Sequence, residues 1–479
     1  MRHWLLLFAL FTAPAVAGDD LDAMNAASQA WDRYAQLGSR DDPAAADLLA
    51  GSTLRHYGFL RDAALVASAE QVRRLPLSDR VFVYVLRAKL DGDRLAALDD
   101  RDIARLCVRE GWCGVASPAP GEAVSQLSHV TLIASDRAVG ELGPPTGTQF
   151  QFGPELAREA GAWKVMAETL ALDESTGIQH EITRSGMSET QMLQFIVARL
   201  AGGEGDAPPL AVLDRPLRDD ATARTRLNET WPRYEDGYRA RVTALEKKAA
   251  DGDSLAQFAL GSLLYSGALP AIAPKDSVRA LQLLEQASDA GNAQAAAAVI
   301  QALTQDYTPA KGKPVPADTV AKLARHTRRA AEGGVGPAMA HLGGLIFNGA
   351  GGNGRDCQQA EEWSARAEDA GVTGARNDRV WFLATCPIAA QRDPKRAMAL
   401  AGHMIAQADT LSYAELDTVA AALAANGRFD EAVHYQQRAI AGLPQEATDT
   451  RRRMRQRLAV YQRRHDWVQD YNAYEQPVL

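Results

Sequence analysis

The chain has 479 residues, 46% of them hydrophobic, which is enough for several domains with buried cores. Its formal net charge is −8 at pH 7. An acidic protein of this kind binds the phosphate backbone poorly, so we expect no nucleic-acid partner.

The first 17 residues have the three parts of a secretory signal peptide. Arg2 is the positive part, Trp4 to Thr12 the apolar part, and Ala15-Val16-Ala17 the cleavage site. The apolar run is too short to cross a bilayer comfortably, although a membrane anchor is the alternative. We expect a protein that is soluble after cleavage, periplasmic or secreted, with no membrane span.

Residues 18–175 are predicted to form an α+β domain. The apolar spacing predicts helices over residues 20–38, 42–69 and 100–109, and another over 79–90 with Ser78 as its N-cap. Residues 129–142 then read as a strand, a turn and a second strand, and residues 163–170 as a closing strand. Helices followed by an antiparallel meander define the class.

The segment ELAREAGAWKV resembles the strand–turn–Trp–Lys ending of nuclear-transport-factor-two-like cone folds. The resemblance implies a fold that can enclose a pocket, and so a small-molecule-binding or enzymatic alternative. The candidate polar residues are His56, Tyr57 and His129. A structural role is the simpler interpretation of each, because no motif places an acidic partner beside it.

Residues 176–245 are predicted to be a linker with connecting helices. Residues 173–190 are polar and turn-rich, residues 189–200 form a helix, and the glycines and prolines of 202–209 form the linker itself. A long helix over 219–248 is expected to be interrupted at Trp231-Pro232.

Residues 246–375 contain a repeat whose apolar and small residues recur in steps of four, which places them on one helix face. The first clear unit has Gly252, Ala256, Leu260, Gly261 and Tyr265, and the second has Gly334, Ala338, Leu342, Gly343 and Phe347 at the same offsets.

An alanine also stands four residues before a glycine at Ala287–Gly291, Ala330–Gly334 and Ala367–Gly371. The four register glycines are spaced by 39, 43 and 37 residues, within the range of helical-hairpin repeats. This pattern resembles the Sel-one-like repeat, a relative of the tetratricopeptide repeat. The resemblance implies an all-α solenoid of hairpins that binds a protein or peptide.

Residues 376–479 resemble a tetratricopeptide array, with a helical hairpin turning at Asn426-Gly427. Residues 451–472 are expected to form a capping helix. Its basic run, RRRMRQR, is interpreted as the solvated face of that helix, and an acidic partner or phospholipid is the alternative.

The four cysteines allow three pairings. Cys357 and Cys386 flank the Gly371 turn at nearly equal distances, so an antiparallel hairpin would bring them together. Cys107 and Cys113 form the second candidate pair. Reduced, buried thiols are the alternative, and zinc is not expected because no histidines accompany these cysteines.

Gly349, Gly351 and Gly354 match GxGxxG, but the preceding residues have helical spacing, so a hairpin loop is the better interpretation. No catalytic, cofactor-binding or metal-binding residue is predicted. We expect a protein- or peptide-binding scaffold rather than an enzyme; the alternatives are the pocket described above and binding to peptidoglycan.

Overall fold

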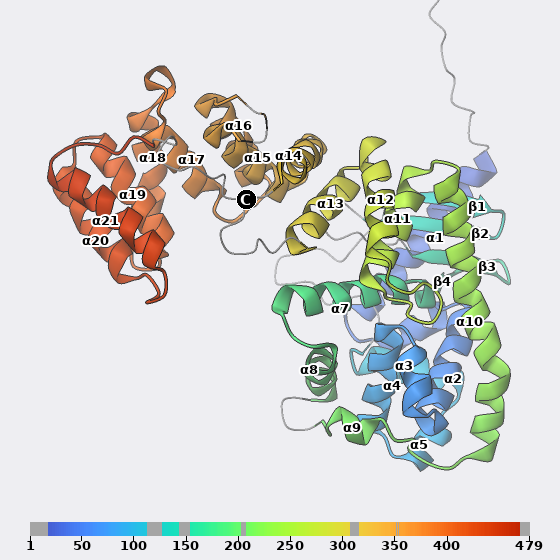
Figure 1. Ribbon diagram of the computed structural model, residues 1–479. Helices are drawn as coiled ribbons and strands as arrows, with labels where there is room; N and C mark the ends of the chain where they lie inside the picture. The colour runs from blue at the N-terminus through green and yellow to red at the C-terminus, as the bar shows by residue number, and fades with distance from the viewer. Residues whose placement is uncertain are drawn as a thin grey trace, which may run out of the picture. The chain divides into compact units, whose positions relative to one another are not determined.

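The computed structural model describes residues 18–112, 127–142, 154–202, 207–306, 316–350, 352 and 354–469 (Figure 1). The predicted signal peptide lies outside these ranges. The chain divides into two compact units. Unit 1 comprises residues 1–248 and 259–280, and unit 2 comprises residues 249–258 and 281–479. None of the described helices is long and apolar enough to span a membrane.

Unit 1 begins with helices, as predicted. They are α1 (Gly18–Gly38), η1 (Pro43–Leu48), α2 (Gly51–Val66), α3 (Ala69–Arg74), α4 (Leu77–Lys89), α5 (Gly92–Ala96) and α6 (Asp100–Arg109).

The single helix predicted over 42–69 is wrong at its start, because the chain there pairs with a strand. Leu49 forms a bridge with Val165, and the Ala50 N–H donates to the Val165 carbonyl at 2.8 Å. This pairing separates η1 from α2.

Ser78 is not the N-cap of α4, which begins one residue earlier at Leu77. The Ser78 hydroxyl lies 2.9 Å from the Ala171 carbonyl, and the Ser78 N–H donates to the Ser175 hydroxyl at 3.0 Å. The residue therefore joins α4 to a later helix instead of satisfying its own helix terminus.

The meander predicted after the helices is present as four antiparallel strands in the order β1-β2-β3-β4. The strands are β1 (Leu127–Ala134), β2 (Arg137–Leu142), β3 (Glu155–Glu159) and β4 (Ala162–Met166). Ala160 and Gly161 have positive φ, as a tight hairpin turn requires. The closing strand is shorter than predicted, because the chain turns into η2 (Ala167–Thr169). Helix α1 packs on the sheet.

Residues 173–190, predicted to be turn-rich, instead lie largely in a helix. It is α7 (Ala171–Ser185), which ends at the left-handed Gly186 (φ 68°). Ile178 and Ile182 of this helix pack against the core of unit 1. It is followed by α8 (Glu189–Ala201) and α9 (Leu210–Leu213), and residues 203–206 of the predicted linker lie outside the described ranges.

Helix α10 (Ala221–Ala250) runs through Pro232 without a break, contrary to the prediction. A helical proline costs about 3 kcal/mol in an isolated helix. Here Trp231 and Tyr234 pack on Phe59 of α2, with ring centroids 5.4 and 4.1 Å away, and this burial offsets the cost. One core extends from Ala27 to Trp231, so the predicted boundary after residue 175 divides residues that share a core.

Two further helices, α11 (Ser254–Ser266) and α12 (Ser277–Asp289), each include residues of both units. Unit 2 continues with α13 (Ala293–Asp306), α14 (Ala317–Glu332), α15 (Gly336–Asn348), α16 (Cys357–Asp369), α17 (Ala375–Thr385), η3 (Ala389–Gln391), α18 (Pro394–Ile405), α19 (Tyr413–Ala425), α20 (Phe429–Ala441) and α21 (Thr448–Gln462). From α13 to α21 each helix packs on its neighbours in the chain. The predicted array of helical hairpins is confirmed.

The capping helix α21 ends at Gln462 rather than at residue 472. Arg464 has a φ of 60°, which reverses the chain. The residues that follow return to α17, where the Gln469 N–H donates to the Thr385 carbonyl at 2.9 Å.

Candidate functional site

The register glycines of the repeats lie just after helix ends and have left-handed backbones. The φ values of Gly252, Gly291, Gly334 and Gly371 are 88°, 95°, 94° and 77°. A side chain is strained in this region, which explains glycine at each helix stop.

The alanine four residues before Gly291, Gly334 and Gly371 accepts a hydrogen bond across each turn. The N–H donors are Asn292, Val335 and Val372, and their distances to the carbonyls of Ala287, Ala330 and Ala367 are 3.0, 2.9 and 2.9 Å. This is the Schellman bond that ends a helix. All three alanines are fully buried.

Gly343 lies where α15 approaches α16. A Cβ at this position would stand 2.8 Å from the Ser364 hydroxyl and 2.9 Å from the Ala360 carbonyl oxygen. The remaining repeat residues pack in the interior: Ala256, Leu260, Gly261, Ala338, Leu342 and Phe347 are buried, and Tyr265 is half-buried. Phe347 stacks on Phe382 with ring centroids 4.3 Å apart, which connects one repeat to the next.

The Cys357–Cys386 disulfide is present, with Cα atoms 6.1 Å apart at the open end of the α16–α17 hairpin. Cys107 is also disulfide-bonded. Cys113, its expected partner, lies outside the described residues, so that pairing stays a prediction.

The first helix of each repeat, here called the A helix, carries half-buried residues at fixed offsets from its register glycine. The A helices considered are α13, α15 and α17, and the offsets are seven and ten. The residues are Ala298, Gln301, His341, Gly344, Asp378 and Trp381, which we call the A-helix strip. Because repeats stack in register, equivalent positions face the same side of the solenoid.

Polar atoms on or beside this strip lack partners among the described residues. Gln294 Oε1 and Asn377 Oδ1 are buried and accept no hydrogen bond. Burial raises the pKa of Asp378 to about 6, and a hydrogen bond from Asn377 offsets this only in part. Burial also lowers the pKa of His341, which keeps it neutral at pH 7. Gln294 and Asn377 therefore keep unpaired oxygens inside the repeats, and Asp378 is the half-buried carboxylate that the strip offers to a partner.

The basic run of α21 was interpreted as a solvated helix face, and this is wrong for one of its arginines. Arg457 is buried and donates two hydrogen bonds to Asp417, at 2.9 and 2.7 Å. Its guanidinium also lies over the rings of Trp381 and Trp467, 5.4 and 5.8 Å from their centroids. Arg452 remains exposed, as expected. Arg457 therefore packs on Trp381, the last residue of the A-helix strip.

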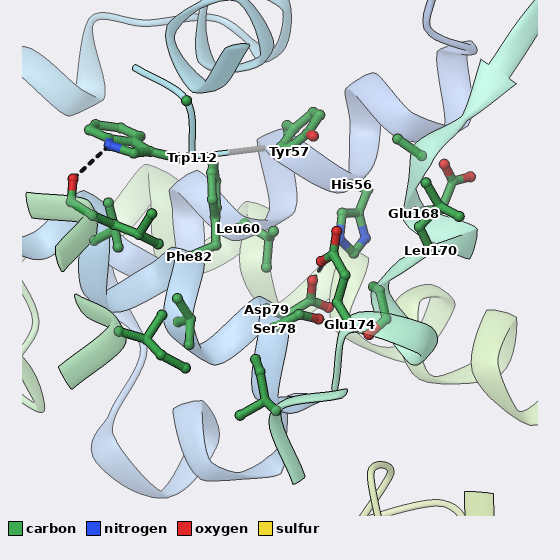
Figure 2. Close-up of a pocket in the computed structure, with 18 of the residues that line it drawn as sticks. His56, Tyr57, Leu60, Ser78, Asp79, Phe82, Trp112, Glu168, Leu170 and Glu174 are labelled. Carbon is green, nitrogen blue, oxygen red and sulfur yellow. Dashed lines mark hydrogen bonds and ion pairs between the residues drawn. The ribbon is translucent and has the colours of Figure 1, made fainter. Parts of the chain in front are cut away.

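Unit 1 contains a cavity of about 520 Å³ between its helices (Figure 2). None of the described strand residues lines it, so it is not a pocket enclosed by the sheet. Its lining comes from α1, α2, α4, α7, α8, η2 and short loops: Tyr34, Asp41, His56, Tyr57, Leu60, Ser78, Asp79, Val81, Phe82, Val85, Gly111, Trp112, Ala167, Glu168, Leu170, Ala171, Glu174, Ile178, Ile196 and Leu200.

A histidine–aspartate pair stands at the polar end of this cavity. His56 Nε2 lies 3.0 Å from Asp79 Oδ1, and the other oxygen of Asp79 accepts from the hydroxyls of Tyr234 and Tyr238, at 2.5 and 3.3 Å. Burial disfavours protonation of His56, but the charge and hydrogen bond of Asp79 and the charge of Glu168 outweigh it, so its pKa is raised. The ring of His56 stacks on Tyr234.

Two further carboxylates lie at the same end. Glu168 accepts a short hydrogen bond from Thr53, and Glu174 points toward His56 in Figure 2. Burial, followed by nearby tyrosinate and carboxylate charge, raises the pKa of Tyr57 well above its ordinary value. Tyr57 is therefore a neutral hydroxyl at physiological pH.

Other candidates from the sequence lie elsewhere. His129 is exposed on β1 and takes no part in the cavity. Gly349 is the left-handed C-cap of α15, as a hairpin loop requires, while Gly351 lies outside the described residues. Within the described ranges, no group of three His, Cys, Asp or Glu side chains is placed to hold a metal ion.

Sequence reasoning missed Asp79 as the partner of His56. One side of α4 carries Asp79, Phe82 and Leu86. An acidic residue on an otherwise apolar helix face could have indicated a buried, paired carboxylate. Neither the sequence spacing nor any motif connects it to His56.

Comparison with solved structures finds similar helical-repeat chains. A Sel1 repeat protein from Oxalobacter formigenes is 20% identical with a TM-score of 0.31, and the match covers 46% of this chain and 86% of that one. A protective antigen of uropathogenic Escherichia coli displaying an SLR fold is 18% identical with a TM-score of 0.28, and the match covers 57% of this chain and 55% of that one. No family model matches the sequence. No curated protein matches it either. The array of helical hairpins is a finding of the structure itself, and both the Sel-one-like and the cone-fold resemblances stay predictions.

Proposed function

We propose that this chain is an exported scaffold that binds a protein or peptide along the A-helix strip. The observation that carries the proposal is the half-buried carboxylate of Asp378, whose pKa burial raises to about 6. Burying a carboxylate without an oppositely charged partner destabilises a folded protein, so such a group calls for an explanation.

A bound polypeptide supplies the missing partner. A lysine or arginine of an extended segment would pair with the half-buried carboxylate of Asp378. Trp381 adds a half-buried aromatic surface of the kind that anchors interfaces. The expected partner segment is therefore extended and carries at least one basic residue.

Export is supported by two independent features. The first 17 residues have the pattern of a secretory signal peptide. The Cys357–Cys386 disulfide also suits an oxidising compartment such as the periplasm.

The test is site-specific photocrosslinking of the full chain in its native cells. A photoreactive residue at Trp381 or Gly344 is expected to label one polypeptide, and the same residue at Gln358 or Asp369, which are exposed on α16, is expected not to. Equal labelling from both helices would refute the strip as the binding surface. Adducts consisting of peptidoglycan rather than protein would favour cell-wall binding instead. Cell fractionation tests export in the same strains.

A further inference from the structure

The cavity of unit 1 plays no part in the function proposed above. We propose that it binds a small amphiphile that has an apolar, aromatic-sized body and a cationic amine head.

Charge at the polar end selects the head group. Asp79, Glu168 and Glu174 lie at this end, whereas Asp41 lines the cavity beside Gly111, next to Trp112. His56 is the single basic residue among the lining side chains, and no lysine or arginine is included. With His56 protonated the formal charge of the polar end is −3 + 1 = −2. A low-dielectric wall strengthens this field, so an ammonium is attracted and a carboxylate is repelled.

The carboxylates are held in place before any ligand arrives. Asp79 already accepts from His56, Tyr234 and Tyr238, and Glu168 accepts from Thr53. Fixed acceptors lose little freedom on binding, which favours affinity. Glu174 is exposed and extends from α7 toward the same end, beside His56 (Figure 2). It is therefore the carboxylate best placed to meet an incoming amine.

The opposite end of the cavity favours the apolar body of the ligand. It is lined by large apolar side chains, chiefly Leu60, Phe82, Val85, Trp112, Ile196 and Leu200. The Trp112 indole N–H donates to the Leu200 carbonyl at 3.1 Å, so the polar atom of this ring is satisfied and the ring adds apolar surface to the lining. A volume of about 520 Å³ is within the range of small-molecule sites.

Calorimetric titration of the full chain with three matched probes tests the proposal. The probes are 4-phenylbutylamine, 4-phenyl-1-butanol and 4-phenylbutanoate, which share a body and differ in head-group charge. We expect the amine to bind at least about tenfold more tightly than the alcohol, since it gains a charge-assisted hydrogen bond, and the carboxylate to bind weakest. An equal affinity for all three, tighter binding of the carboxylate, or no saturable binding of the amine would overturn the proposal.

Variants locate the binding. Glu174→Gln is expected to weaken the amine about five- to tenfold and to leave the alcohol unchanged. Glu229→Gln is the matched control, because Glu229 is exposed on α10 of the same unit and does not line the cavity. Ile196→Trp, at a half-buried position of α8, should fill the apolar end and abolish binding of both probes. Equal effects of Glu174→Gln and Glu229→Gln on amine binding would place the ligand elsewhere and refute the site.

Discussion

Two adjacent glycines of α15 are expected to respond to the same substitution with opposite signs. In Gly343→Ala, the new Cβ would lie 2.8–2.9 Å from atoms of α16, one of them a backbone oxygen that cannot move freely. Overpacking of this kind costs about 1–3 kcal/mol, and helix propensity returns up to about 1 kcal/mol, so we expect a net loss of about 1–2 kcal/mol. In Gly344→Ala, no atom lies within 4 Å of the added carbon, so we expect a gain of about 0.5–1 kcal/mol.

Hydrogen exchange measured on the amides of α15 and α16 in the full chain separates the two cases. A difference of about 2 kcal/mol between the variants corresponds to roughly thirtyfold in the local opening equilibrium. Both helices should open more readily in Gly343→Ala and less readily in Gly344→Ala. If both variants were stabilised, or both destabilised equally, the close approach inferred for the small residues of this repeat would be wrong.

Three further predictions concern a disulfide and two buried ionisable groups. Replacing Cys357 and Cys386 together by alanine should lower the unfolding free energy of unit 2 by about 3–4 kcal/mol, because the bond joins residues 29 apart; denaturant unfolding would show no change if the bond were absent. Because burial raises the pKa of Asp378 to about 6 from 3.8, the folded chain binds this proton more tightly than the unfolded chain, and stability falls as pH rises from about 4 to about 6. Asp378→Asn should remove that fall and stabilise the free protein at pH 7 by about 1–3 kcal/mol, whereas an unchanged pH profile of unfolding would argue against burial. Asp79→Asn should lower the pKa of His56, because burial is then opposed only by the charge of Glu168, and an NMR titration in which the pKa did not change would contradict the pairing.

The repeats could be predicted because their signals are local. An alanine, a glycine four residues later and a small residue on the next helix satisfy one turn and one helix contact, and both requirements recur at nearly constant spacing. The structure places Ala330 and Gly334 in the same Schellman turn, as the spacing implied. The Cys357–Cys386 pairing followed from the same hairpin geometry.

The cavity could not be predicted, because its polar end is assembled from distant parts of the chain. His56 meets Asp79 across 23 positions and Asp79 meets Tyr234 across 155. Neither contact has a sequence spacing that identifies it. The continuous path of α10 through Pro232 was missed for the same reason, since the packing that stabilises it involves Phe59 of α2.

The polar residues of the A-helix strip could be predicted from the sequence in part. The offsets that define the A-helix strip can be counted from the register glycines, but burial of Asn377 and Asp378 depends on how closely neighbouring helices pack. Sequence alone gave both residues the appearance of ordinary polar positions on a helix.

The central claim is that the A-helix strip binds the partner through the half-buried carboxylate of Asp378. Once photocrosslinking has identified that partner, its affinity for Asp378→Asn and for Asp369→Asn is the most direct test. Both changes remove one negative charge, from neighbouring repeats, but Asp369 is exposed on α16. We predict that Asp378→Asn weakens binding about tenfold, as expected for loss of a charge-assisted hydrogen bond, and that Asp369→Asn leaves it unchanged. Equal affinities of the two variants and the unmodified chain would contradict the account.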